Sequence, residues 1–206
     1  MTDAGHDGSI DKLSADQNGI GVGRGNYIYT YTGKHFYIED PQPEDIDIVD
    51  IAHALSMLCR FGGHSREFYC VAQHSVLISQ LVSDENALWG LLHDASEAYL
   101  CDIPRPFKAY LENYKMLEER IQRAIADKFG LSWPMPEEIH NIDQKIVVNE
   151  ALLLWKESPF WTTKHESVPH LALALPCWNP AFAKQEFLNQ FRICTCAPGS
   201  WKPRPV

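Results

Sequence analysis

The stretch LLHDASEAYLCDIPRPFK (residues 91–108) places ionisable side chains inside an apolar helical pattern. His93 and Asp94 stand side by side among leucines and alanines, and Glu97 and Asp102 follow them. Burying an ionisable side chain without a partner costs several kcal/mol. The stretch therefore predicts that partners elsewhere in the fold compensate these charges, and it makes a buried polar site the first feature to look for.

Helical periodicity continues on both sides of this stretch. Apolar residues recur at helical spacing in six segments, residues 45–60, 68–82, 86–100, 113–130, 137–155 and 180–194. Asn179 followed by Pro180 is typical of the beginning of a helix. Alternating aromatic residues in segment 26–40 predict a short hairpin around Thr32 and Gly33. We therefore expect an all-α fold, a helical bundle with a short N-terminal β-hairpin.

Length and composition fit one soluble domain. The chain has 206 residues, of which 45% are apolar and 22% are charged, as in ordinary globular proteins. Residues 1–26 are polar and rich in glycine, which predicts a flexible arm, and residues 27–206 are expected to form a single domain.

The charge balance excludes some classes of partner. Eighteen Lys and Arg residues stand against 27 Asp and Glu residues, and the net charge of −9 argues against binding nucleic acid through its phosphates. The sequence has neither a signal-peptide pattern nor an apolar run of about 18 residues, so we expect a cytoplasmic protein with no membrane partner.

Four residues in three of the expected helices form a candidate metal site. His74 lies in the segment before His93 and Asp94, and Asp143 lies in the apolar segment 137–155. Packed side by side, these segments would bring together two imidazoles and two carboxylates, a mixed nitrogen and oxygen set that suits a divalent transition metal. Each residue alone has an ordinary interpretation, such as a hydrogen-bonded core histidine or a surface carboxylate. Their joint occurrence in apolar segments, in the order H, HD, D, favours the metal site.

This order resembles the signature of the HD-domain metal-dependent phosphohydrolases. The segments AQHSV (residues 72–76) and LLHDASEAYLCDIPRPFK resemble the small nucleotidase branch of that superfamily. The chain is similar, over roughly residues 48–155, to bacterial 5′-deoxynucleotidases and to phage-encoded dATP triphosphohydrolases. The resemblance implies an HD-domain helical bundle and an enzyme that hydrolyses phosphoester bonds.

The resemblance leaves two reactions open. One is a 5′-deoxynucleotidase that cleaves the 5′ phosphoester of 2′-deoxynucleotides and releases deoxynucleoside and phosphate. The alternative is a dATP or dNTP triphosphohydrolase that releases deoxynucleoside and triphosphate. A non-catalytic nucleotide sensor and a helical interaction module are further alternatives. An enzyme is favoured over both, because the ligands and Glu97 are all present.

The resemblance also implies a cofactor and partners. His74, His93, Asp94 and Asp143 would hold the metal. Only His140 lies between the HD pair and Asp143, so we expect one divalent transition metal ion, Co²⁺, Mn²⁺, Zn²⁺ or Fe²⁺, with Mg²⁺ accompanying the substrate phosphates as a further option. The expected partners are a small-molecule nucleotide and further copies of the chain in a homo-oligomer, a dimer or larger.

The resemblance also implies roles in catalysis and substrate binding for six further residues. Glu97 would orient the attacking water, and Asp102 would assist near the leaving 5′ oxygen or bind the sugar. Arg60 would contact phosphate oxygens or the 3′ hydroxyl. Phe61 takes the place of the aromatic residue that closes off the ribose 2′ position, which in the bacterial nucleotidases is usually tryptophan. Among the remaining candidates, Lys108 would contact phosphate, and His64 would either touch phosphate or cap a turn.

Overall fold

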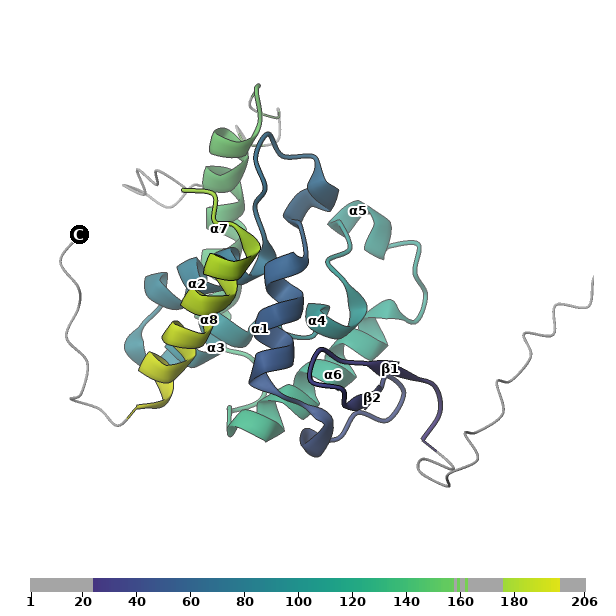
Figure 1. The fold of residues 1–206 in the computed structure, drawn as a ribbon. Coiled ribbons are helices and arrows are strands. Elements are labelled where there is room, and N and C mark those ends of the chain that lie inside the picture. The colour runs from purple at the N-terminus through teal and green to yellow at the C-terminus, as the bar shows by residue number, and fades with distance from the viewer. Residues whose placement is uncertain (1–23, 158, 160–161, 163–175, 197–206) are drawn as a thin grey trace, which may run out of the picture.

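The computed structural model describes residues 24–157, 159, 162 and 176–196, and helices dominate this part of the chain (Figure 1). The helices are α1 (Ile48–Met57), α2 (Val71–Leu81), α3 (Ala87–Leu92), α4 (Glu97–Leu100), α5 (Arg105–Lys108), α6 (Tyr114–Phe129), α7 (Glu137–Leu154) and α8 (Pro180–Thr195). Strands β1 (Tyr27–Tyr29) and β2 (His35–Tyr37) pair antiparallel. The predicted all-α fold with a short hairpin is confirmed. Most of the predicted arm, residues 1–23, lies outside the described residues.

Helix ends follow from local side-chain chemistry. The Asp47 carboxylate accepts a hydrogen bond from the backbone N–H of Val49 (2.9 Å) and caps α1. Asn179 caps α8 in the same way, with Pro180 at the first helical position, as the sequence predicts. None of the helices in the described ranges is both long enough and apolar enough to cross a membrane.

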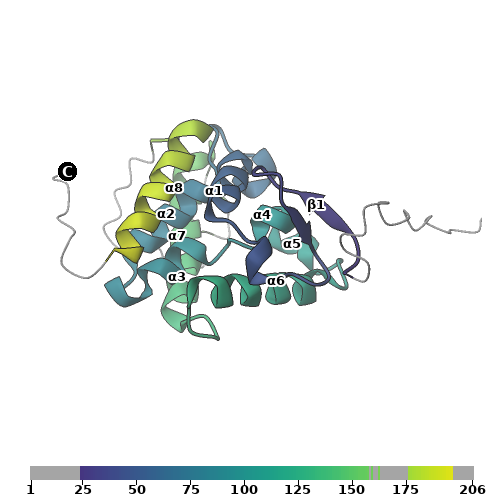
Figure 2. The same cartoon turned by 60° about the horizontal axis from the view of Figure 1, so that its bottom comes forward.

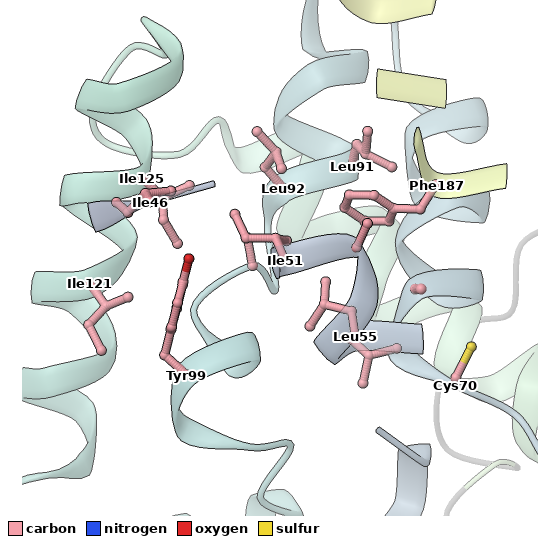
Figure 3. Close-up of a cluster of buried hydrophobic side chains, with 14 of the residues drawn as sticks. Ile46, Ile51, Leu55, Cys70, Leu91, Leu92, Tyr99, Ile121, Ile125 and Phe187 are labelled. Atoms are coloured by element: carbon pink, nitrogen blue, oxygen red, sulfur yellow. The ribbon is translucent and has the colours of Figure 1, made fainter. Parts of the chain in front are cut away.

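The core is shared by helices that are far apart in sequence. In Figures 1 and 2, α8 lies along α1 and α2, and α3 packs against α2 and α8. Figure 3 shows side chains from α1, α3, α6 and α8 meeting in one apolar cluster, among them Ile51, Leu92, Ile125 and Phe187. A second cluster joins α2, α3, α6 and α7. These contacts fix α2, α3 and α7, the elements that carry the candidate site.

Helices α2 and α3 approach each other closely at Gly90. A Cβ atom at Gly90 would lie 2.9 Å from the Cα atom of Ser79, on the backbone of α2. Only glycine leaves room for this contact. The carbonyl oxygen of Gly90 in turn accepts a hydrogen bond from the Nδ1 atom of His93 (2.8 Å), so the close approach also places a site residue.

The predicted continuous helix over residues 86–100 was wrong, because the structure breaks it between α3 and α4. In a continuous α-helix the N–H of Ser96 would donate to the carbonyl of Leu92. The Gln122 side chain of α6 stands between these two groups: its Oε1 accepts from Ser96 N–H (3.2 Å) and its Nε2 donates to Leu92 O (2.7 Å). Residues 93–96 therefore form a tighter turn with bonds three residues apart, such as Glu97 N–H to Asp94 O (3.0 Å).

The segment after α1 also differs from the prediction. We expected a helix over residues 45–60, but α1 ends at Met57, and Arg60 opens the 3₁₀ turn η2 (Arg60–Gly63). The backbones of Cys59 and Cys70 pair as an isolated antiparallel β-bridge, and the neighbouring Arg60 N–H donates a hydrogen bond to Tyr69 O (2.9 Å). This pairing replaces the last helical turn and holds Arg60 and Tyr69 next to the beginning of α2.

Candidate metal centre

The structure brings the four predicted ligands together. His74 projects from α2, His93 and Asp94 from the turn after α3, and Asp143 from α7. The two Nε2 atoms of the histidines lie 3.2 Å apart. Asp94 Oδ2 lies 3.1 Å from His93 Nε2 and 3.6 Å from His74 Nε2, and Asp143 Oδ1 lies 3.2 Å from His74 Nε2.

These distances fit a shared metal ion. Metal–ligand bonds of about 2.1 Å in tetrahedral or octahedral arrangement separate neighbouring ligand atoms by about 3.0–3.4 Å. The four separations of 3.1–3.6 Å are close to this range. His74, His93 and Asp94 each have one possible ligand atom within 4.8 Å of those of the other two. Asp143 lies outside this group of three but contacts His74, and we call the four residues together the ligand cluster. Two imidazoles and two carboxylates are also a suitable donor set.

Hydrogen bonds at the Nδ1 atoms orient both histidine rings. His93 Nδ1 contacts the carbonyl oxygen of Gly90, and His74 Nδ1 contacts Glu150 Oε1 (2.6 Å). A carbonyl and a carboxylate only accept hydrogen bonds, so each Nδ1 carries the proton. Each Nε2 atom is therefore the one that faces the cluster, as a metal ligand requires.

The charged groups of the four predicted ligands shift one another's pKa values. Burial and the nearby Arg60 charge lower the pKa of His74, but Glu150 and Asp143 outweigh them and raise that pKa to about 9. Burial raises the pKa of Asp143, and the stronger effect of His74 brings it down to about 2. The pKa of Asp94 is lowered as well, because His93 and His74 outweigh its burial. Without metal, a proton on His74 thus compensates the carboxylates, and a divalent cation can replace it.

A cavity opens beside the cluster. Its volume is about 610 Å³, within the range of sites that bind small molecules. Asp94 and Asp143 line it, together with Arg60, Phe61, Glu97, Asp102, Ile103, Pro104, Arg105, Pro106, Lys108, Gln144 and Val147. Two of the four predicted ligands, Asp94 and Asp143, therefore line the same cavity as the other candidates Glu97, Asp102, Arg60 and Lys108, whereas His74 and His93 are not among its lining residues.

Glu97 is a buried carboxyl group with a free oxygen. Only 5% of the residue is exposed, and its Oε2 atom has no hydrogen-bond partner among the described residues. Its Oε1 atom lies 3.7 Å from Lys108 Nζ. Burial, together with the charges of Asp94 and Asp102, raises the pKa of Glu97 well above the ordinary range. Burial also raises the pKa of Asp102.

Arg60 is more constrained than the sequence indicates. It is 8% exposed, its Nη2 atom donates to Glu150 Oε2 (3.1 Å), and its Nη1 atom lies 3.5 Å from Asp94 Oδ2. Burial opposes its charge, but Glu150 and Asp94 outweigh burial and raise the pKa of Arg60. The Nε atom is buried and has no partner among the described residues. Arg60 thus belongs both to the cavity wall and to the support of the cluster.

The aromatic candidate and its neighbour are placed differently. Phe61 lines the cavity and packs edge-on against Trp155, with ring centroids 4.5 Å apart. Its backbone adopts φ 57°, a strained conformation for a bulky residue of the kind that is concentrated at functional sites. His64 is exposed and is not among the residues that line the cavity, and its backbone N–H closes the turn by donating to Phe61 O (3.2 Å). The structure does not bring His64 to the cluster.

Two residues that the sequence analysis did not select support the site. Glu150 is fully buried and binds His74, and Gln122 shapes the turn that carries His93 and Asp94. A signal for Glu150 exists, because it is an ionisable residue in the apolar segment VVNEALLLW, seven residues after Asp143 and so on the same helix face. Gln122 carries no such signal.

Comparison with known proteins places the chain in a family. No protein-family model matches it. It is 47% identical over 137 residues to the uncharacterized protein YfdR of Escherichia coli K12, an alignment that covers 66% of this chain and 77% of YfdR. It is 36% identical over 118 residues to the uncharacterized protein RCAP_rcc00048 of Rhodobacter capsulatus, covering 52% of this chain and 60% of that protein. The chain belongs to the same protein family as YfdR.

Proposed function

We propose that this protein is a metal-dependent phosphohydrolase of the HD-domain type that cleaves the 5′ phosphoester of 2′-deoxynucleotides and releases deoxynucleoside and phosphate. One observation carries the proposal: Asp94 and Asp143 belong both to the ligand cluster and to the wall of the cavity. A nucleotide in that cavity would have its phosphate directly against the ligand cluster. The resemblance of the H, HD, D pattern to HD-domain phosphohydrolases supports the same assignment.

The ligand cluster and Glu97 have separate tasks. His74, His93, Asp94 and Asp143 would hold a divalent transition metal ion, which when bound lowers the pKa of water towards neutrality and polarises phosphoryl oxygens. Glu97 holds a proton more readily than an ordinary carboxyl group, and its unpartnered Oε2 atom can accept one from the attacking water. Asp102, on the same wall, serves the 5′ oxygen that leaves with the nucleoside.

Basic and aromatic side chains would hold the substrate. Arg60 presents a planar guanidinium that suits phosphate oxygens, and Lys108 adds a second positive charge. The Phe61 ring is held against Trp155 and offers a fixed apolar surface to the sugar. These groups define a site for an anionic ligand with an apolar part, as a nucleotide is.

A triphosphate substrate is the second candidate. Arg105 and Lys108 both line the cavity, which supplies positive charge beyond the single phosphate that Arg60 would contact. The enzyme would then release deoxynucleoside and triphosphate from dATP or related dNTPs. The bond that breaks is the same in both reactions, between the α-phosphorus and the 5′ oxygen.

The test combines metal analysis with product analysis. The purified protein should contain about one transition metal ion per chain. With Co²⁺, Mn²⁺, Zn²⁺ or Fe²⁺ it should release phosphate or triphosphate from a panel of deoxynucleotides. Hydrolysis in ¹⁸O-labelled water should place the label in the phosphate product. A protein without stoichiometric metal and without hydrolysis across the panel would contradict the proposal, and label in the nucleoside would contradict attack at phosphorus.

A further inference from the structure

A fully buried carboxylate lies directly behind the ligand cluster. Glu150 belongs to α7, two turns beyond Asp143, and its exposed fraction is 0%. Three donors converge on it. Oε1 accepts from His74 Nδ1 (2.6 Å) and from the hydroxyl of Tyr69 (2.7 Å), and Oε2 accepts from Arg60 Nη2 (3.1 Å). Its contacts therefore join a predicted metal ligand to a residue of the cavity wall.

The donors around Glu150 require a group that only accepts. An ionised carboxylate offers two accepting oxygens, whereas a glutamine side chain offers one accepting oxygen and one donating NH₂ group. In Glu150→Gln, the NH₂ group would face either Arg60 or the pair formed by His74 and Tyr69. One donor would then meet another donor at a fully buried position. Burying a charge without a partner is costly, so the carboxylate also keeps Arg60 stable in the interior.

The two histidines differ in what holds them. His93 is oriented by the carbonyl of Gly90, three residues earlier in its own chain segment. His74 is oriented by Glu150, 76 residues away on another helix. The position of His74 Nε2 therefore depends on how α7 packs against α2, because Glu150 of α7 is hydrogen-bonded to the His74 ring.

We infer that Glu150 is the positioning residue of the candidate metal centre. It keeps the proton of His74 on Nδ1 so that Nε2 faces the metal, and it holds Arg60 in place at the cavity wall. This inference rests on the proposed metal binding and adds to it one residue that acts through two others. Removing the hydrogen-bond partner of a metal-binding histidine weakens metal affinity about 10- to 100-fold.

The test measures metal affinity, which does not depend on finding a substrate. Dissociation constants for Zn²⁺ and Co²⁺ are obtained by competition with a chelator for the wild-type protein and for Glu150→Gln. We expect a 10- to 100-fold weaker affinity in the variant and a changed visible absorption spectrum of its Co²⁺ form. Glu138→Gln makes the same substitution at the other end of α7, away from the cluster, and should leave the affinity unchanged.

A second pair of variants separates positioning from folding. Glu150→Gln removes the nearer of the two carboxylates that pair with the buried Arg60 and can prevent folding, whereas the double variant Glu150→Gln/Arg60→Met removes the Arg60 charge as well. The double variant should fold and still bind metal 10- to 100-fold more weakly than Arg60→Met alone. Equal affinity in these two proteins would overturn the inference, because Glu150 would then be only a counterion for Arg60. A wild-type protein that binds no metal would overturn the proposed function first and the inference with it.

Discussion

Asp94 and Glu97 are three residues apart, yet their environments shift their pKa values in opposite directions. The histidines lower the pKa of Asp94, whereas burial and neighbouring carboxylates raise the pKa of Glu97. Carboxyl groups that are shifted apart in this way usually have different tasks in catalysis. Asp94 is suited to bind a cation, and Glu97 is suited to exchange a proton.

Substitutions at these two positions should therefore have different effects. Asp94→Ala should lose metal binding and activity together, because one of four ligands is removed. Glu97→Gln should keep its metal and its fold while its turnover falls by about 10²- to 10⁴-fold, as for a positioned acid–base group. Metal content by elemental analysis and kcat for a deoxynucleotide check both expectations. Full metal occupancy in Asp94→Ala, or near wild-type turnover in Glu97→Gln, would contradict these roles.

The break between α3 and α4 is the most consequential feature at the scale of elements. It brings His93 and Asp94 to His74 of α2, and the Gln122 side chain supplies the hydrogen bonds that the interrupted helix lacks. A buried polar group left without a partner costs about 1–3 kcal/mol. The geometry of the cluster thus depends on an amide from α6.

Gln122→Leu tests this dependence with a side chain of similar size. It leaves Ser96 N–H without its partner and removes the Gln122 bond to Leu92 O. We expect the free energy of unfolding to fall by about 1–3 kcal/mol and metal affinity to weaken. Urea unfolding and chelator competition measure the two effects, and Gln80→Leu on the exposed side of α2 is the matched control. Unchanged stability and affinity would show that the turn forms without the amide.

A second contact between elements has a predictable pH dependence. At the beginning of α7, Glu138 accepts hydrogen bonds from Ser83 N–H (3.0 Å), Ser83 Oγ (2.7 Å) and Asn86 Nδ2 (2.6 Å). The bonds from Asn86 and Ser83 lower the pKa of Glu138 below its ordinary value of 4.5. Because the folded pKa is lowered, the ionised group stabilises the protein above pH 4.5, and this contribution disappears as the pH falls through the folded pKa.

Glu138→Gln should therefore cost more stability at pH 7 than at pH 3. Urea unfolding of both proteins at the two pH values gives the difference in free energy of unfolding. Glu137→Gln, at the exposed neighbouring position, controls for the loss of one negative charge in the first turn of α7. A difference that is equal at both pH values would mean that the ionised carboxylate does not contribute.

At the scale of the whole molecule, the negative charge of the protein limits which anionic substrates the cavity can bind. The chain carries a net charge of −9. The cavity wall has three basic side chains and four acidic ones, so its formal charge, with every carboxyl group counted as ionised, is −1 before any metal binds. A divalent ion would make the site positive. Binding of an anionic substrate therefore requires the metal, and binding of a triphosphate also requires the positive charges of Arg105 and Lys108.

Lys108→Ala distinguishes the two proposed substrates. Lys108 Nζ pairs with Glu118 Oε1 (2.7 Å) and lies 5.1 Å from the centre of the Tyr114 ring, so the cation is held near the cavity. Its loss should raise KM for a deoxynucleoside triphosphate about 10-fold and for a monophosphate much less. Steady-state kinetics on both substrates measure this, with Lys128→Ala at the far end of α6 as control. Equal effects on both substrates would place Lys108 at the α-phosphate or outside the site.

The sequence by itself determined the features that depend on neighbouring residues. Helical spacing of apolar residues predicted the bundle, the aromatic alternation predicted the hairpin, and Asn179 with Pro180 predicted the beginning of α8. The pattern H, HD, D also selected the four residues that the structure brings together, because ionisable groups in apolar segments are conspicuous without any structure.

Only the tertiary structure decided the features that depend on long-range contacts. Gln122 interrupts a helix 26 residues earlier in the chain, and its effect on the Leu92–Ser96 bond has no local pattern. The hydrogen bonds of the buried Glu150 come from Arg60, Tyr69 and His74, which all lie in another part of the chain. Periodicity is a property of neighbouring residues, whereas the partner of a buried polar group is found only when distant segments pack together.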